Sequence, residues 1–247
     1  MLPKGIAIMK QETSLGRWYQ RYIGKWIPMY GLLPLIGCCL FNSMIYTGTQ
    51  LTLKNAYHYD LTSALDRKIP FVPEWVLIYV LSFAFWALSY IVIAREGKEK
   101  WYRFAAADMM SRLFCMVFFV FWPTTNIRPQ VVGDGFIAWL MRLIYALDAP
   151  TNLFPSIHCL VSWFCFIGVR RSKKLPAWYK AFTLIFALLI CASTQFTKQH
   201  YLVDIPGGIL IAELCWFISN HTKCDQIIRR FFEAVGKRLF GVCYYDE

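Results

Sequence analysis

The chain has 247 residues, 57% of them hydrophobic, and a formal net charge of +11. The hydrophobic residues occur in long uncharged runs, which argues against a soluble domain and indicates a protein embedded in a bilayer. The basic residues lie between these runs and form no single patch. We therefore expect them to set the orientation in the membrane, and we expect no nucleic-acid partner.

Three kinds of segment follow one another along the chain. Residues 1–25 are polar, basic and aromatic, which predicts a cytoplasmic interfacial segment. Residues 26–220 contain six apolar stretches, which predict a six-span membrane domain. The predicted spans are residues 27–47, 75–94, 104–122, 154–170, 179–197 and 201–219. Residues 221–247 place apolar side chains at helical spacing among basic ones, which predicts an amphipathic cytoplasmic tail.

The predicted fold class is an all-α integral membrane protein with six transmembrane helices and short amphipathic interfacial helices. One interfacial helix is expected over residues 134–147, where apolar residues recur at helical spacing. Of the 26 Lys and Arg residues, 19 lie in the N-terminal segment, the second and fourth connections and the tail. The positive-inside rule then places both termini in the cytoplasm, and the first, third and fifth connections outside it.

Several ionisable residues lie inside the predicted spans. Asp108 and Arg112 are four residues apart, so we expect them to pair on one helical face. Glu213 lies at a depth similar to that of Arg112, and we expect the two to join the third span to the sixth as a buried ion pair. A transport pathway through these charges is the alternative.

A histidine and a carboxylate stand one helical turn apart between the last two spans. On one helix, His200 and Asp204 would share a face, and the carboxylate would fix the tautomer of the ring. The other ring nitrogen would then be free to attack. A second histidine, His158, follows Pro155, which suits the first position of a helix whose cap would lie near Asn152 or Thr151.

The unusual polar residues all fall at the predicted extracytoplasmic end of the spans, and a phosphate ligand would explain each of them. Helix N-termini and arginine side chains bind phosphate, and Lys adds a point charge. The candidates are Arg128, Ser156, His158, Lys198, His200 and Asp204. A metal site with two His and one carboxylate is the alternative, but the nearby Arg and Lys would repel a cation. We expect no metal and no other cofactor.

These stretches resemble the signatures of a known family. P-S-I-H (155–158) and S-x6-H-x3-D (193–204) are similar to the second and third signatures of the type 2 phosphatidic acid phosphatase superfamily, and Arg128-Pro129 resembles the end of the first. The six-span layout is also similar, and the resemblance covers most of the chain from about residue 61, including L-D-R-K-I-P-F-V-P.

The resemblance implies transfer of phosphate through a phosphohistidine without metal. It makes His200 the nucleophile, His158 the acid and Asp204 the carboxylate that orients His200. By the same resemblance, Arg128, Ser156 and the peptide at Ile157 would hold the phosphate.

The chain departs from the family pattern at two positions. Phe121 stands where the family usually has Lys, and Thr194 stands where it usually has Arg. On a continuing helix, Lys198 would lie one turn beyond Thr194 on the same face. We therefore expect Lys198 to replace the missing charge in phosphate binding.

The predicted function is that of a membrane phosphohydrolase acting on a lipid phosphate at the extracytoplasmic interface. Its partners would be the lipid substrate and the bilayer, while the headgroup and the oligomeric state are left open. A lipid phosphotransferase is the first alternative, similar to the phosphosphingolipid and inositol phosphorylceramide synthases. A non-catalytic lipid transporter and a membrane scaffold are the others.

Overall fold

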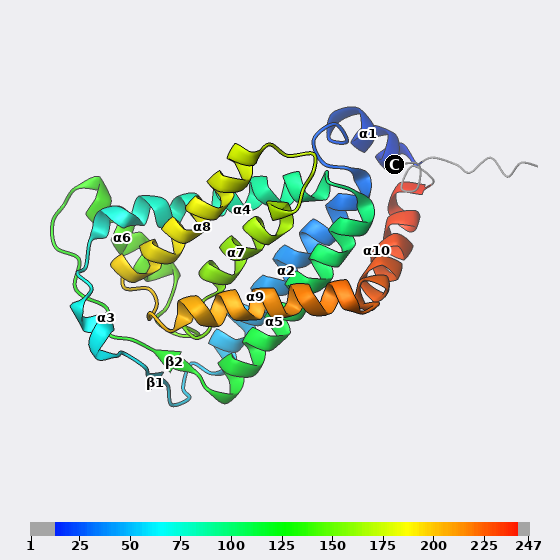
Figure 1. The fold of residues 1–247 in the computed structure, drawn as a ribbon. Helices are drawn as coiled ribbons and strands as arrows, with labels where there is room; N and C mark the ends of the chain where they lie inside the picture. The colour runs from blue at the N-terminus through cyan, green and yellow to red at the C-terminus, as the bar shows by residue number, and fades with distance from the viewer. Residues whose placement is uncertain (1–12, 242–247) are drawn as a thin grey trace, which may run out of the picture.

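A computed structural model describes residues 13–241, which form a nearly all-α bundle (Figure 1). The all-α part of the predicted fold class is thereby confirmed. Two short parallel strands, β1 (Tyr59–Asp60) and β2 (Thr124–Thr125), join two connections at one end. The helices are α1 (Ser14–Tyr22), α2 (Met29–Thr52), α3 (Ala64–Lys68), the 3-10 turn η1 (Pro73–Trp75), α4 (Val76–Ala94), α5 (Lys98–Phe121), α6 (Phe136–Leu147), α7 (Ile157–Arg170), α8 (Ala177–Phe196), α9 (Asp204–His221) and α10 (Cys224–Phe240).

Within the described residues, four helices are long and apolar enough to cross a membrane. They are α2, α4 with its preceding η1 turn, α5 and α8, and each coincides with a predicted span. The helix α7 has 14 residues and so rises about 21 Å, less than the hydrocarbon core of roughly 30 Å. The helix α9 has 18 residues and includes two acidic side chains, Asp204 and Glu213. Four of the six predicted spans are therefore supported.

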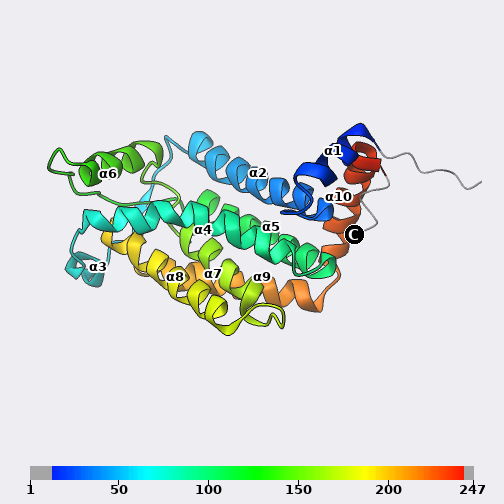
Figure 2. The ribbon, with the colours of Figure 1, turned by 90° about the horizontal axis from the view of Figure 1, so that it is seen from above.

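The short helix α7 lies inside the bundle, where it packs against α4, α8 and α9 (Figures 1 and 2). Its start is close to α9 because Gly208 has no side chain. A Cβ atom at Gly208 would lie 2.8 Å from the carbonyl oxygen of Ser156 and 3.0 Å from the backbone nitrogen of Leu160. This close approach brings the first turn of α7 next to the first turn of α9.

The buried ion pair of α5 forms as predicted. Arg112 Nη2 lies 2.8 Å from Asp108 Oδ1, and the side chains are 2% and 1% exposed. The hydroxyl of Tyr90 also donates to Asp108, at 2.7 Å. The expected pair between Arg112 and Glu213 is wrong. Glu213 instead accepts hydrogen bonds from Arg170 Nη2 on α7, at 2.8 Å, and from the indole of Trp163.

Amphipathic helices lie at the two ends of the bundle (Figure 2). The helix α6 confirms the one expected over residues 134–147, and α10 confirms the tail helix. The helices α1 and α10 lie side by side, and Thr13 Oγ1 donates to the carbonyl of Leu239 at 2.9 Å. Residues 1–12 and 242–247, which belong to the predicted terminal segments, lie outside the described residues.

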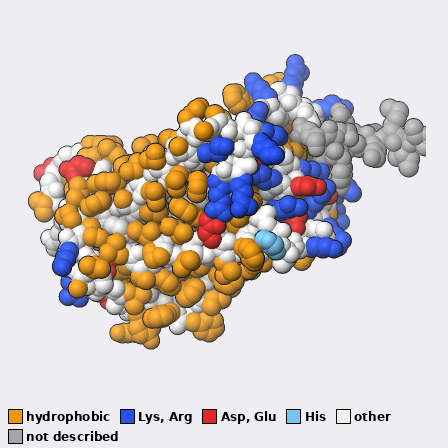
Figure 3. All heavy atoms as spheres, viewed as in Figure 1, with side chains coloured by type: hydrophobic (Ala, Val, Ile, Leu, Met, Phe, Trp, Pro, Cys, Tyr) orange, Lys and Arg blue, Asp and Glu red, His pale blue; other side chains and the backbone are white. Residues whose placement is uncertain are grey.

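Charge is unevenly spread over the surface that Figure 3 shows. Basic side chains gather toward the end that holds α1 and α10, while the middle of the bundle is mostly hydrophobic. A hydrophobic belt next to a basic end is the pattern expected of a membrane protein.

The connection around α3 is fastened to the turn between α8 and α9. Asp66 Oδ1 accepts a hydrogen bond from the backbone of Leu202 at 2.7 Å, and Asp66 also caps α3 through Ser63. The ammonium of Lys198 donates to the carbonyl oxygens of Asp66 and Ile69, at 2.9 and 2.6 Å. The turn is therefore held by the L-D-R-K-I segment that precedes α4.

The hydrogen bonds also set the charge state of Asp66. Partial burial by itself raises the pKa of a carboxyl group, but hydrogen bonds from Ser63 and Leu202, together with nearby Lys198, outweigh it and lower the pKa of Asp66. Burial lowers the pKa of Lys198, and Asp66 opposes that shift.

Replacing Arg112 by Met should destabilise the fold by about 3–5 kcal/mol, because Asp108 would be buried without its partner. The double variant Asp108→Leu with Arg112→Met should recover much of this loss, since no charge is then left in the core. Thermal unfolding in detergent measures the stability of both variants. Arg170→Met is the control, and it should lower the free energy of unfolding less, because the pair that it breaks is more exposed. Equal losses in the single and double Arg112 variants would contradict this interpretation.

Asp66→Asn should destabilise the protein by about 1–3 kcal/mol at pH 7, because an amide cannot accept all the bonds that the carboxylate accepts. A lowered pKa gives a contribution that is complete above the ordinary carboxyl pKa and is lost as the pH falls through the lowered value. The difference from wild type should therefore shrink in acid. Unfolding in detergent from pH 7 downward measures it, with Asp134→Asn in an exposed loop as the control. A difference independent of pH would count against the assignment.

Candidate active site

His200 lies in the turn between α8 and α9, and it is paired with Asp204. His200 Nδ1 is 2.9 Å from Asp204 Oδ2 and 3.0 Å from the carbonyl oxygen of Leu153. Because both neighbours of Nδ1 are acceptors, Nδ1 carries the proton and Nε2 keeps the lone pair. This arrangement leaves Nε2 as the nitrogen that can attack.

The predicted pairing of His200 with Asp204 is therefore confirmed, but the helical reason for it is wrong. The helix α8 ends at Phe196 and α9 begins at Asp204 itself. Between them Lys198 adopts a left-handed conformation with φ 53°, which turns the chain. The carboxylate of Asp204 closes this turn by accepting a second hydrogen bond, from the backbone of Tyr201 at 3.1 Å.

The helix α7 begins at Ile157, two residues later than predicted. Ser156 is the N-cap, and its Oγ accepts a hydrogen bond from the backbone of Cys159 at 3.2 Å. Pro155 therefore precedes the cap rather than opening the helix. Asn152, expected near the cap, instead donates to Thr49 of α2 at 2.8 Å. The N–H groups of Ile157 and His158 lie in the first turn, where a helix offers them no acceptor of its own.

His158 faces His200 across a short gap. The two ring centroids are 5.8 Å apart. The ring of His158 stacks on Tyr79 with a centroid distance of 4.4 Å, and Trp86 lies against it at 5.2 Å. His158 Nε2 is buried and has no hydrogen-bond partner among the described residues. The structure thus brings the two predicted histidines together on one site.

Arg128 is held by one of its guanidinium nitrogens, and the other two have no partner within the described residues. Nη1 donates to the backbone carbonyl of Asp148, and the group lies over the ring of Tyr145 at 4.8 Å. Nε and Nη2 are buried and have no hydrogen-bond partner within the described part of the chain. Two open donors on one planar group fit two oxygens of a phosphate.

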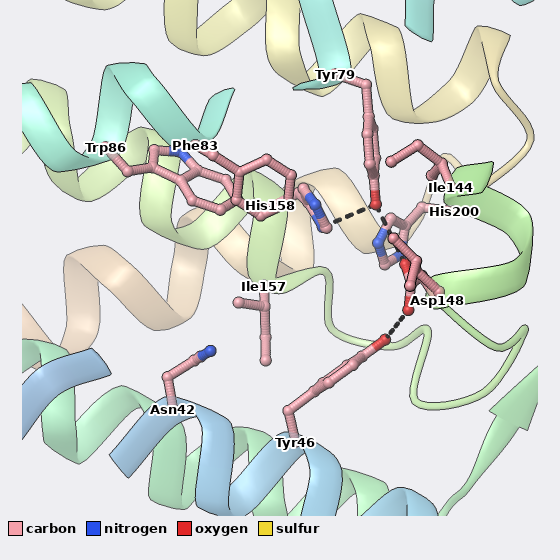
Figure 4. A pocket seen from close by; sticks show the side chains of 11 residues that line it. Asn42, Tyr46, Tyr79, Phe83, Trp86, Ile144, Asp148, Ile157, His158 and His200 are labelled. Carbon is pink, nitrogen blue, oxygen red and sulfur yellow. Dashed lines mark hydrogen bonds between the residues drawn. The ribbon is translucent and has the colours of Figure 1, made fainter. Parts of the chain in front are cut away.

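Two cavities meet at His200. One, called the polar cavity below, has a volume of about 340 Å³ and is lined by the charged residues Asp66, Arg67, Arg128 and Lys198 among others. The other has a volume of about 290 Å³ and mostly apolar walls, with His158 and Asp148 among its lining residues (Figure 4). The ring of His200 therefore separates a cationic space from an apolar one.

The two positions that depart from the family pattern lack a cation in the structure as well. Phe121 ends α5 and is 81% exposed, and the hydroxyl of Thr194 donates to the carbonyl of Cys191. Lys198 is not one turn beyond Thr194 on a helix, because α8 ends first. Lys198 nevertheless lines the polar cavity, with its ammonium on the two carbonyls of the α3 connection.

The sequence alone did not single out several residues that the site contains. Tyr46, Tyr79 and Trp86 reach it from α2 and α4, and Asp148 reaches it from the connection after α6. Tyr79 and Trp86 are seven residues apart, a spacing that places them on one helical face. Nothing in the sequence around Asp148 (D-A-P-T-N) indicated that its carboxylate belongs to the site.

Comparisons with known proteins agree with this geometry. The family model described as the PAP2 superfamily matches residues 71–218, more than half of the chain. A PA-phosphatase related-family protein of Dictyostelium discoideum is 28% identical over 116 residues. The matched region covers 46% of this chain and 19% of that protein, so the chain spans only a small part of its relative. No solved structure matches the chain. With the family model matched across both histidines and Asp204, the chain belongs to the PAP2 superfamily.

Proposed function

We propose that the chain is a metal-independent membrane phosphohydrolase that removes phosphate from a lipid phosphate through a phosphohistidine. One observation carries the proposal: two histidine rings lie 5.8 Å apart, and one of them is held by a buried carboxylate on Nδ1. An oriented imidazole with a free Nε2 is a nucleophile, and a second imidazole opposite it can exchange a proton with the leaving group.

The residues have distinct roles in the proposed reaction. His200 Nε2 forms a bond to phosphorus, and the bond from phosphorus to the lipid oxygen breaks. His158 gives its Nε2 proton to that oxygen. Water then attacks the phosphohistidine, and His158 takes a proton from it, which frees phosphate and restores both rings. Asp204 stabilises the charge that His200 gains on attack.

The phosphate would lie against His200 where the two cavities meet, because Arg128 lines the polar cavity and Ile157 lines the apolar one. Arg128 offers its two open N–H groups, and the N–H group of Ile157 adds the positive end of α7. Ser156 accepts the capping bond with its oxygen, so its own hydrogen stays available as a donor. Lys198 also lines the polar cavity and adds positive charge there, although its ammonium already donates to two carbonyls.

The apolar cavity supports a lipid as the leaving group. Asn42, Phe83 and Trp86 line it and also line a neighbouring apolar cavity of about 230 Å³, so the two spaces adjoin between α2 and α4. A hydrocarbon chain attached to the phosphate would therefore find apolar walls on the His158 side of His200.

The six-span topology is part of this proposal, with α7 and α9 as the two shorter spans of the 26–220 membrane domain. The basic end that holds α1 and α10 would then face the cytoplasm with both termini. His158 and His200 lie at the other end, so the site would open at the extracytoplasmic interface. The terminal segments 1–25 and 221–247 would lie on the cytoplasmic surface.

The structure disfavours the transporter alternative, but one observation favours the phosphotransferase alternative. The transporter alternative depends on charges within the spans, but Asp108 pairs with Arg112 and Glu213 pairs with Arg170, which favours a structural role for them. The phosphotransferase alternative has a specific observation in its favour. His200 borders two separate cavities, so an acceptor alcohol has space on the side that the leaving lipid vacates.

His200→Ala should lower phosphate release by at least about a thousandfold, because it removes the nucleophile. The assay uses detergent-solubilised protein and a panel of phosphatidic acid, phosphatidylglycerol phosphate, a polyprenyl diphosphate and a sphingolipid phosphate. His221→Ala, at the far end of α9, is the matched control and should keep the wild-type rate. Activity should also be unchanged by a chelator. Release that survives in His200→Ala would overturn the proposal.

Added alcohols distinguish hydrolysis from transfer. With a short alcohol or an inositol-like polyol present, we expect free phosphate to remain the main product, because water reaches the phosphohistidine through the polar cavity. Product analysis by mass spectrometry measures the partition. A new phosphate ester that grows as free phosphate declines would instead establish the transferase.

A further inference from the structure

A second carboxylate, Asp148, lies on the wall of the apolar cavity and is held by two tyrosines. The hydroxyl of Tyr46 on α2 donates to Asp148 Oδ1 at 2.5 Å, and the hydroxyl of Tyr79 on α4 donates to Oδ2 at 3.2 Å (Figure 4). A carboxylate has no hydrogen to give, so both hydroxyls must point toward it. The orientation of the Tyr79 hydroxyl is therefore set by Asp148.

Tyr79 in turn contacts the proposed acid. Its hydroxyl oxygen lies 3.5 Å from His158 Nδ1, and its ring stacks on the imidazole at 4.4 Å. Because the hydrogen of Tyr79 is directed to Asp148, its oxygen can only accept from His158. The proton of His158 is then held on Nδ1, and Nε2 is the nitrogen that gains and loses a proton.

We propose that Asp148 acts through Tyr79 as a positioning pair for His158, in the way that Asp204 acts directly on His200. The inference rests on the proposed function and adds two residues to it. Asp148 and Tyr79 do not touch the reacting atoms. They keep His158 in the one tautomer that serves both steps of the reaction.

The proton balance shows why the tautomer matters. In the first step, His158 carries protons on both nitrogens, and its Nε2 proton goes to the leaving oxygen as the bond to phosphorus breaks. The neutral ring of His158 keeps its proton on Nδ1, which donates it in a hydrogen bond to the Tyr79 oxygen. Nε2 therefore has a lone pair. In the second step, Nε2 takes the proton of the attacking water. The opposite tautomer has its only proton on Nε2, so giving that proton to the leaving oxygen would leave an imidazolate, which slows the first step. It would also have no base at Nε2 for the second step.

Asp148 also connects the acid to the phosphate site. Its backbone carbonyl accepts from Arg128, while its side chain holds Tyr79. Asp148, the residue that follows α6, therefore fixes both the guanidinium that would bind the phosphate and the tyrosine that orients His158. A displacement of this connection would disturb both together.

The test compares two leaving groups on one lipid. The substrates are the lipid phosphate that wild type cleaves fastest and its analogue with sulfur in place of the bridging oxygen. A thiolate leaves without a proton far more readily than an alkoxide, since a thiol is much more acidic than an alcohol (the Cys thiol has a pKa of about 8.5). Impaired protonation by His158 should therefore slow the oxygen ester much more than the sulfur ester.

Tyr79→Phe should lower kcat for the oxygen ester by at least about tenfold and for the sulfur ester by less than about threefold, with a smaller effect on KM. Asp148→Asn should reproduce this selectivity, because its amide can donate to Tyr79 and turn the hydroxyl toward Nδ1. The double variant should be no worse than the more damaging single variant, as expected of residues that act in series.

Tyr90→Phe is the matched control, because it removes a tyrosine-to-aspartate hydrogen bond from the same helix without touching either histidine. It should leave the ratio of the two rates at its wild-type value. Equal losses for both esters in Tyr79→Phe, or no loss for either, would overturn the pair while leaving the proposed function intact. Full activity in His200→Ala would overturn both.

Discussion

The hydrogen bond between His200 Nδ1 and Asp204 is the interaction on which the rest of the site depends. Asp204 is fully buried, and a buried carboxylate is costly unless donors surround it. The imidazole and the backbone of Tyr201 supply those donors, and the N-terminus of α9 adds its dipole. The same bonds that satisfy the buried carboxylate also fix the ring, so stability and orientation have one cause.

The second histidine reaches this pair through backbone packing rather than through a bond. Gly208 lets the first turn of α9 approach Ser156 closely, which brings the start of α7 alongside Asp204. Leu153, just before α7, then supplies a carbonyl oxygen that is a second acceptor for His200 Nδ1, beside Asp204. A short helix surrounded by α4, α8 and α9 can be placed this accurately because its neighbours determine its position on several sides.

Local spacing predicted the features that depend on local geometry, and it failed where tertiary contacts decide. The pairs Asp108–Arg112 and His200–Asp204 were both predicted from a spacing of four. Only the first is helical, and Pro206 was the available signal, since a continuous helix through the turn would set its ring against the carbonyl of Leu202. The partner of Glu213 and the place of Asp148 depend on how separate helices are rotated, which spacing along the chain does not encode.

The altered family positions change how a phosphate would be held. Phe121 is exposed at the end of α5, and the hydroxyl of Thr194 bonds its own helix, so neither supplies charge. The ammonium of Lys198 donates to two carbonyls, so only one of its three N–H groups is left for a phosphate. Recognition would then rely on the open guanidinium edge of Arg128 and on peptide N–H groups at the start of α7. Donors fixed in this way select the geometry of a phosphoryl group more than its total charge.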